Sequence, residues 1–250
     1  MDYTIAENFT LPSLGKIYDV EVNPNIKLRS MTTQDEMKRL SASDRAYQTI
    51  CEIIDDCLVE KPGISCYDMH IGDFQYLLHK IRVVTYGPDY KLDSTCPYCG
   101  STNSGVVNLD DINVFSYDPD IHKYFEFELP KTKKHIKLKM QTPRILDEIP
   151  ERAREIQRKY PDYVGDPAFL LSIEMMIDEV DGKKPNPVNI TDFVRSLPMM
   201  DTNYIVKHCD RVNELIGVDT LLRNTCGACG LDYNSRFRTT GEFFGPSVDI

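Results

Sequence analysis

One six-residue pattern occurs twice in this chain, as TCPYCG at Thr95–Gly100 and as TCGACG at Thr225–Gly230. A C-x-x-C turn followed by glycine places two thiolates on the same side of a metal ion, and two such turns complete a tetrahedral site. The pattern therefore predicts one structural Zn²⁺ ion. Its predicted ligands are Cys96, Cys99, Cys226 and Cys229.

Such a site forces two distant parts of the chain to meet. The layout is typical of a zinc ribbon, in which two metal-binding turns lie on neighbouring hairpins, here within Leu92–Leu109 and Leu221–Phe237. A ribbon ordinarily has a short connection between its turns. The long segment between Cys99 and Cys226 is thus interpreted as a hairpin and a helical insert. The ends of an insert lie close together, so we expect the metal to close its base.

A redox role for either cysteine pair is a competing interpretation. A thioredoxin-type dithiol follows a strand in a βαβ unit, and the sequence predicts no such unit. A site closed by four thiolates leaves no position for water or substrate, which indicates a structural role. The sequence also lacks the G-x-S-x-G, P-loop, H-E-x-x-H and G-x-G-x-x-G motifs. We therefore expect no catalytic residues and no enzymatic activity.

The charge balance narrows the choice of partners. The chain has 250 residues, with 29 Lys and Arg against 39 Asp and Glu, and a formal net charge of −10. Such an acidic protein is repelled by nucleic acid and by anionic membranes. The N-terminal MDYTIAENFTLPS is not typical of a signal peptide, so we expect a reducing cytosol. Cys51, Cys57 and Cys209 lie in apolar helical patterns and are predicted to be buried.

Hydrophobic periodicity predicts an α+β protein that is mainly helical, with a small zinc-ribbon-like β module. Four regions are expected. They are an extended arm, hairpin and helix pair (1–90), the first metal turn with β-strands (91–141), an inserted helical subdomain (142–217), and the second metal turn with strands and a tail (218–250).

Local signals give more detailed expectations. Alternation predicts a hairpin between Ile17–Val22 and Ile26–Met31, and Thr33 with Glu36 forms a candidate capping box. Pro150 is expected to end one helix and start another. The apolar residues from Phe169 to Val180 recur at helical spacing.

A second hairpin is predicted from Tyr124–Leu129 and His135–Met140. Its row of lysines is interpreted as a solvated strand face, with a ligand-binding patch as the alternative. The arm Met1–Lys16 and the tail Phe243–Ile250 have few packing signals of their own. We expect them to order on a partner, or else to be frayed termini.

The order of the motifs resembles a known family. LPSLGKIY and IKLRSMTTQDEMKRL come first, YLLHKIRVVTYGPDY leads into CPYCG, and DTNYIVKHCDRVNELIGVDTLLRNTCGACG closes the series. This series is similar to the baseplate hub subunit and hub-assembly proteins of T-even-type contractile-tailed phages. The resemblance covers most of Leu11–Cys99 and Asp201–Gly230. It implies a non-enzymatic protein that contacts other hub or tail proteins in the infected bacterial cytoplasm or in the virion tail baseplate.

A zinc-ribbon module that binds nucleic acid or regulates transcription is the alternative. Arg236 and Arg238 alternate with Phe237, and the stretch 131–139 is rich in lysine. The net charge of −10 opposes this function.

Overall fold

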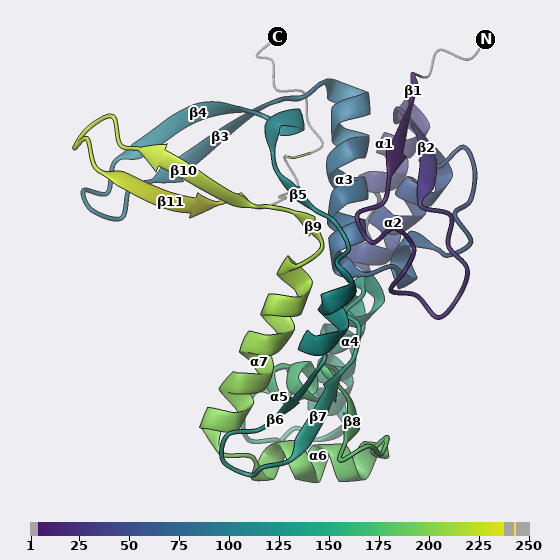
Figure 1. Ribbon diagram of the computed structural model, residues 1–250, viewed down its shortest axis with the longest axis vertical. Helices are drawn as coiled ribbons and strands as arrows, with labels where there is room; N and C mark the ends of the chain where they lie inside the picture. Colours follow the sequence, from purple (N-terminus) through teal and green to yellow (C-terminus); the bar gives the residue numbers. More distant parts are fainter. Residues whose placement is uncertain (1–4, 238–242, 244–250) are drawn as a thin grey trace.

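The computed structural model describes residues 5–237 and Phe243, and it has an N-terminal body, a lower body and a lateral arm (Figure 1). Helices and small antiparallel sheets alternate along the chain, which confirms the α+β class. The N-terminal body contains β1 (Ala6–Thr10), β2 (Asn25–Arg29), α1 (Thr33–Arg39), α2 (Ala46–Cys57) and α3 (Ile71–Tyr86). The arm consists of β3 (Asp89–Thr95), β4 (Thr102–Asn108), β10 (Leu221–Thr225) and β11 (Asp232–Arg236).

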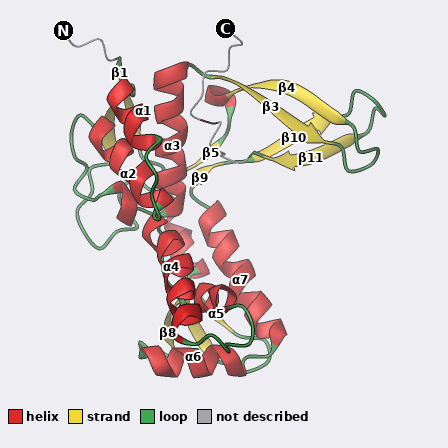
Figure 2. Ribbon diagram, turned by 180° about the vertical axis from the view of Figure 1, so that it is seen from behind, coloured by secondary structure: helices red, strands yellow, loops and turns green. Residues whose placement is uncertain are grey.

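The rest of the chain forms the lower body and its connections, seen from behind in Figure 2. The lower body and its connections contain β5 (Val114–Phe115), β6 (Glu126–Glu128), β7 (His135–Leu138), α4 (Pro143–Lys159), α5 (Pro167–Glu174), β8 (Ile177–Val180), α6 (Pro187–Ser196), α7 (Met199–Glu214) and β9 (Gly217–Val218). One apolar core lies under α2 and α3, and a second lies between the β6–β7–β8 sheet and helices α5, α6 and α7. Every helix in the described residues is too short or too polar to cross a bilayer.

The N-terminal arm belongs to the protein's own core. Strand β1 pairs with β2, so the predicted strand at Ile17–Val22 is wrong. The chain turns there because Leu14 and Gly15 adopt φ values of 52° and 69°. Leu11 is 0% exposed in the core of the N-terminal body. The prediction of a free docking arm is therefore wrong from β1 onward. Of the predicted tail, only Phe243 lies within the described residues, and it is buried.

Buried Asp73 anchors the loop that follows β1. The backbone N–H of Ser13 donates to its Oδ1 at 3.0 Å, and the Tyr18 hydroxyl donates to its Oδ2 at 2.6 Å. These bonds satisfy a carboxylate in the first turn of α3, where negative charge also interacts favourably with the helix dipole. The LPSLGKIY motif thus fixes the N-terminal segment to α3.

Helix α1 starts one residue earlier than predicted. Its capping box uses Thr32 and Asp35 in place of Thr33 and Glu36. MTTQDE offers two overlapping boxes, and Arg29 decides between them because it forms an ion pair with Asp35 at 2.8 Å.

Two further expectations for the lower body are wrong. Helix α4 continues through Pro150, which removes a single N–H donor from a 17-residue helix and lies at an exposed position. The apolar run after Phe169 is helix α5 followed by strand β8, which pairs with β7. The predicted β6–β7 hairpin is confirmed. Cys51, Cys57 and Cys209 are buried, as predicted.

The segment between the two cysteine pairs is closed at β5 and β9. These strands pair antiparallel, and the N–H of Asp219 donates to the carbonyl of Asn113 at 2.8 Å. The backbones of Gly72 and Gly217 also meet here, so closely that a Cβ at either position would overlap the other segment. The expectation that the metal site closes this base is wrong, because the cysteines lie at the far tips of the arm.

Candidate metal centre

The four cysteines lie in two hairpin turns that have the same length and the same backbone hydrogen bonds. Strands β3 and β4 pair antiparallel on either side of Cys96–Gly100, and β10 and β11 do so around Cys226–Gly230. The N–H of each glycine donates to the carbonyl of the first cysteine, at 2.9 and 2.8 Å. Gly100 and Gly230 have φ values of 74° and 73°. Glycine is needed because other residues rarely adopt this conformation.

The arm brings the four sulfur atoms together. All four lie within 4.8 Å of one another. The Sγ atoms of Cys96 and Cys229 are 3.8 Å apart, and those of Cys99 and Cys226 are 3.6 Å apart. Four thiolates ~2.3 Å from a tetrahedral zinc ion would be about 3.8 Å from one another. The cluster therefore fits a tetrahedral metal with four thiolate ligands, and both close sulfur contacts join one turn to the other.

The burial pattern of the cluster is also twofold. The first cysteine of each turn, Cys96 or Cys226, is buried, and the second, Cys99 or Cys229, is exposed. Within the part of the chain that the structure describes, Tyr233 alone joins the two buried cysteines in a small core cluster. The tip of the arm therefore has few apolar contacts to hold the two hairpins together, and a shared metal ion would provide a direct connection.

Backbone N–H groups lower the pKa values of the cysteine thiols, whereas neighbouring sulfurs at Cys229 raise its pKa. The N–H groups of Cys229 and Ala228 outweigh burial and lower the pKa of Cys226 to about 6. The Ser101 side chain and backbone lower the pKa of Cys99. The Leu231 N–H favours the Cys229 thiolate, but local desolvation and the adjacent sulfurs of Cys226, Cys99 and Cys96 raise its pKa to about 12. Several thiolates this close repel one another, so a bound cation would stabilise the fully ionised set.

Two contacts between the hairpins position the turns. The N–H of Gly227 donates to Asn103 Oδ1 at 2.9 Å, and the hydroxyls of Ser94 and Tyr233 are 2.7 Å apart. Asn103 and Tyr233 each lie seven residues after the first cysteine of their turn. Sequence reasoning missed both residues, although this equal spacing was a signal for them.

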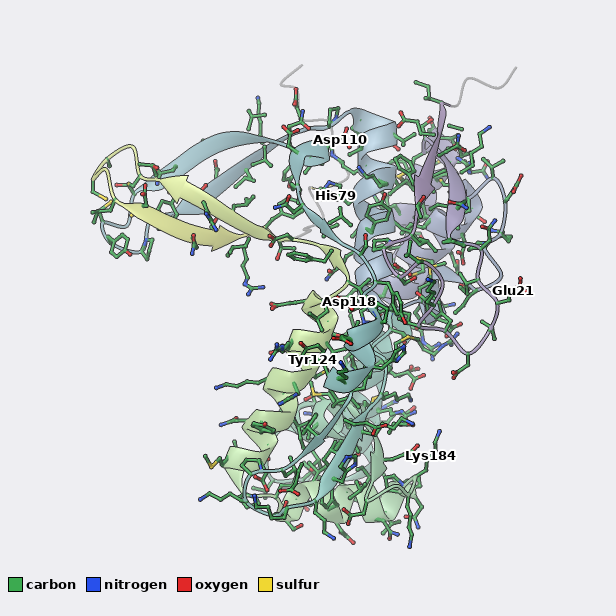
Figure 3. All side chains as sticks on the ribbon, viewed as in Figure 1. Glu21, His79, Asp110, Asp118, Tyr124 and Lys184 are labelled. Carbon is green, nitrogen blue, oxygen red and sulfur yellow. The ribbon has the colours of Figure 1, made fainter. Side chains whose placement is uncertain are left out.

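Aromatic and charged residues fix the base of the arm to α3. Arg82 is fully buried and donates to the carbonyl of Gly87 at 2.9 Å, just before β3. Its guanidinium lies 5.6 Å from the centre of the Tyr90 ring. His79, labelled in Figure 3, lies near the rings of Phe237 and Phe243. The arm is thus anchored at its base independently of the cysteines.

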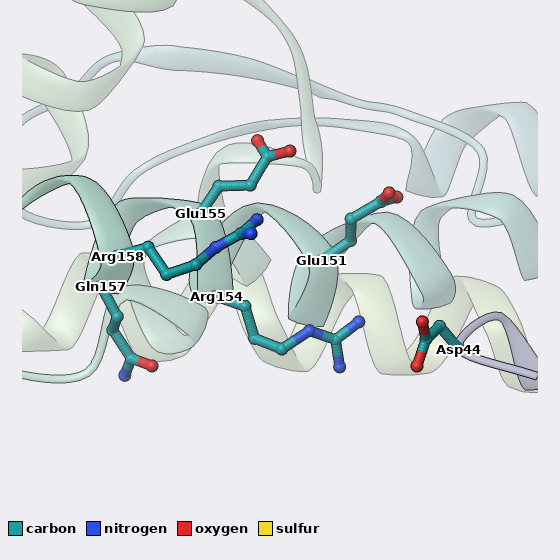
Figure 4. A pocket seen from close by; sticks show the side chains of 6 residues that line it. All are labelled: Asp44, Glu151, Arg154, Glu155, Gln157 and Arg158. Atoms are coloured by element: carbon teal, nitrogen blue, oxygen red, sulfur yellow. The ribbon is translucent and has the colours of Figure 1, made fainter.

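At the other candidate sites, the basic side chains described below lie beside acidic ones. Lys134 pairs with Asp181 at 2.6 Å and Lys137 pairs with Glu179 at 3.2 Å, which supports a solvated face for the lysine row. Arg236 pairs with Glu214 at 2.6 Å. A shallow hollow on α4 has both signs of charge around it (Figure 4). Its lining residues are Asp44, Glu151, Arg154, Glu155, Gln157 and Arg158.

Comparison with known proteins identifies a family. The family model described as T4 bacteriophage base plate protein matches residues 3–245. The match includes the segment between the cysteine pairs, where the motifs gave little resemblance. Searches of curated proteins and of solved structures find no significant match.

Proposed function

The chain belongs to the T4 bacteriophage base plate protein family, and on this basis we propose that it is a structural subunit or an assembly factor of the phage baseplate hub. The match to residues 3–245 is the observation that carries the proposal, because it covers both bodies and the arm. The protein acts through contacts with other baseplate and tail proteins. Its place of action is the infected bacterium and the virion tail.

Zn²⁺ bound by Cys96, Cys99, Cys226 and Cys229 has a structural role in this proposal. The sulfur separations of 3.6 and 3.8 Å support it, since they match the edges of a tetrahedral four-thiolate site. The ion would hold the tips of the two hairpins together, where the small core cluster alone contributes little. With all four positions filled by thiolates, it offers no site for substrate, so we infer no catalysis there.

The arm, rather than either body, is where a metal would influence binding. Removing the ion would release the two tips from one another while β5 and β9 still close the base. A rigid arm presents its surface residues in one arrangement, and partners then bind without first ordering it. The metal therefore supports assembly by pre-organising a binding surface.

The nucleic-acid alternative receives no support from a specific contact. Its basic residues include Arg236, which is paired with Glu214, and Lys134 and Lys137, which are paired with Asp181 and Glu179. The net charge of −10 would also oppose phosphate binding.

A phage with a stop codon early in this gene tests the proposal. Infected non-suppressing cells should accumulate no complete baseplates, and expression of the intact chain from a plasmid should restore them. Electron microscopy of lysates counts the baseplates and tails. Normal baseplate numbers without the protein would contradict the proposed function.

A further inference from the structure

Each hairpin of the arm is a two-stranded sheet, so each strand has an edge with no strand paired to it among the described residues. In an antiparallel pair, alternate residues direct their N–H and C=O groups outward. The bonds from Cys96 N–H to Ser101 O and from Leu109 N–H to Pro88 O fix the alternation for β4. Its outward residues are Thr102, Ser104, Val106 and Asn108.

Charged side chains occupy outward positions on three of the four strands. They are Asp89, Lys91 and Asp93 on β3, Arg223 on β10, and Asp232 and Arg236 on β11. Folded proteins use charges in this way to prevent unwanted pairing at a free edge. Strand β4, TNSGVVN, has no charged residue over its whole length and no proline. Its edge is thus the one in the arm that lacks this protection.

The two hairpins repeat the same pattern, so each position of β4 can be compared with the equivalent position of β11. Val106 and Arg236 both lie ten residues after the first cysteine of their turn. Arg236 is paired with Glu214, whereas Val106 is 62% exposed. A Cβ added at the neighbouring Gly105 would meet no atom within 4 Å. Space is therefore open over the face of β4 at Gly105, and the side chain of the outward residue Val106 is exposed.

We propose that the β4 edge binds an extended segment of another baseplate subunit, which adds a third strand to the β3–β4 sheet. This inference rests on the proposed function. The N–H and C=O groups of Thr102, Ser104 and Val106 supply main-chain hydrogen bonds to the incoming strand. The segment is uncharged along the contact and places a β-branched or aromatic side chain against Val106.

The net charge favours a different subunit over a second copy of this chain. Two copies would each carry a net charge of −10 over the whole chain and would therefore repel one another. A separate subunit held nearby by the rest of the baseplate has a high effective concentration, so a short strand contact is enough to bind it.

Matched proline substitutions test the edge. The N–H of Ser104 points outward, so Ser104→Pro removes no bond between β3 and β4 but removes a donor needed by the incoming strand. Asn234 is its counterpart on β11, eight residues after Cys226, and Asn234→Pro is the control. In phage complementation we expect Ser104→Pro to lower baseplate yield at least tenfold and Asn234→Pro to leave it within twofold of wild type. Thermal melting of both purified variants reports on folding.

A second variant covers the case in which proline distorts the strand. Val106→Arg gives β4 the residue found at the equivalent position of β11 and leaves the backbone free to pair with β3. We expect the same loss of yield with an unchanged melting temperature. Normal yield with both Ser104→Pro and Val106→Arg would overturn the proposal, as would equal losses with Asn234→Pro.

Photo-crosslinking identifies the occupant. With p-benzoylphenylalanine at position 106 during infection, we expect a crosslinked peptide from another baseplate subunit, and none with the probe at position 234. A crosslink to a second copy of this chain, or none at position 106, would contradict the inference. If the stop-codon phage builds no baseplates while Ser104→Pro and Val106→Arg behave normally, the proposed function stands and the strand-binding edge alone is rejected.

Discussion

Substitution of a single cysteine should open the tip of the arm and leave the two bodies folded. Cys96→Ser removes one of the four proposed ligands. As far as the structure describes the chain, the cores of the N-terminal and lower bodies contain no residue of the cysteine turns. Among the described residues, the apolar cluster at the tip consists of Cys96, Cys226 and Tyr233. Loss of the metal therefore affects mainly the association of the two hairpin tips.

The pairing of β5 with β9 determines the size of the loop that the metal closes, and hence the free energy lost when the metal is removed. While that pairing persists, a metal joining the tips closes a loop through Val114 and Val218 of about 24 residues, which corresponds to about 3.4 kcal/mol of chain entropy. The equilibrium constant for separation of the two hairpin tips should therefore increase about 300-fold when the metal is lost. If the whole segment from Cys99 to Cys226 were open, the same relation would give about 4.9 kcal/mol.

Hydrogen exchange measured by NMR tests this estimate. The amide of Gly227, bonded to Asn103 of the other hairpin, should exchange about 300-fold faster in Cys96→Ser. The amide of Phe74 in α3, bonded to the carbonyl of His70, should be unchanged. Cys209→Ser alters a buried cysteine outside the cluster and is the control, with unchanged exchange at Gly227. Unchanged Gly227 exchange in Cys96→Ser, or equal acceleration at Phe74, would refute the reasoning.

The structure makes three further predictions about the two bodies. Leu11→Ala should lower the free energy of unfolding by about 3–5 kcal/mol because Leu11 is fully buried, whereas Ile5→Ala at an exposed position should change it by less than ~0.5 kcal/mol. Urea unfolding measures both, and equal effects would contradict the core position of Leu11. Burial lowers the pKa of His70 to about 4, so below pH ~6.5 the unfolded chain binds a proton that the folded chain does not. Stability should thus fall by about 2 kcal/mol between pH 7 and pH 5, and the fall should be smaller in His70→Gln; a pH dependence identical in the two proteins would exclude His70 as its source. Gly72→Ala should unfold the junction of α3 and β9, since the new Cβ would overlap the carbonyl of Ile216; native near-ultraviolet circular dichroism and an unchanged melting temperature would disprove this packing.

The repeated cysteine pattern was sufficient to predict the two hairpins and the meeting of the four thiols. The geometry of a C-x-x-C turn with glycine depends on residues that are adjacent in the sequence, and this pattern appears twice, each time between Thr and Gly. Long helices such as α3 and α7 were also predictable, because their apolar periodicity and end signals agree. The metal itself stays a prediction.

Features that depend on distant contacts were not predictable in the same way. Arg29 selects Asp35 for the cap of α1, although the local sequence allows Glu36 equally well. Ile177 and Val180 fit a helical stripe, but pairing with β7 makes them a strand. The closure at β5 and β9 spans two residues on each strand, too few for a periodic signal. Because β5 and β9 close the base of the insert, that base does not depend on the cysteines, which lie at the tips of the arm.

Elemental analysis of the freshly purified, reduced protein tests the four-thiolate zinc site most directly. We expect about one zinc atom per chain, and a loss of bound zinc in the double variant Cys96→Ser/Cys226→Ser. The folded fraction of Cys51→Ser/Cys209→Ser, which changes two cysteines outside the cluster, should retain about one zinc atom per chain. A wild-type protein without bound metal, or a Cys96→Ser/Cys226→Ser variant with full zinc content, would rule out the four-thiolate zinc site.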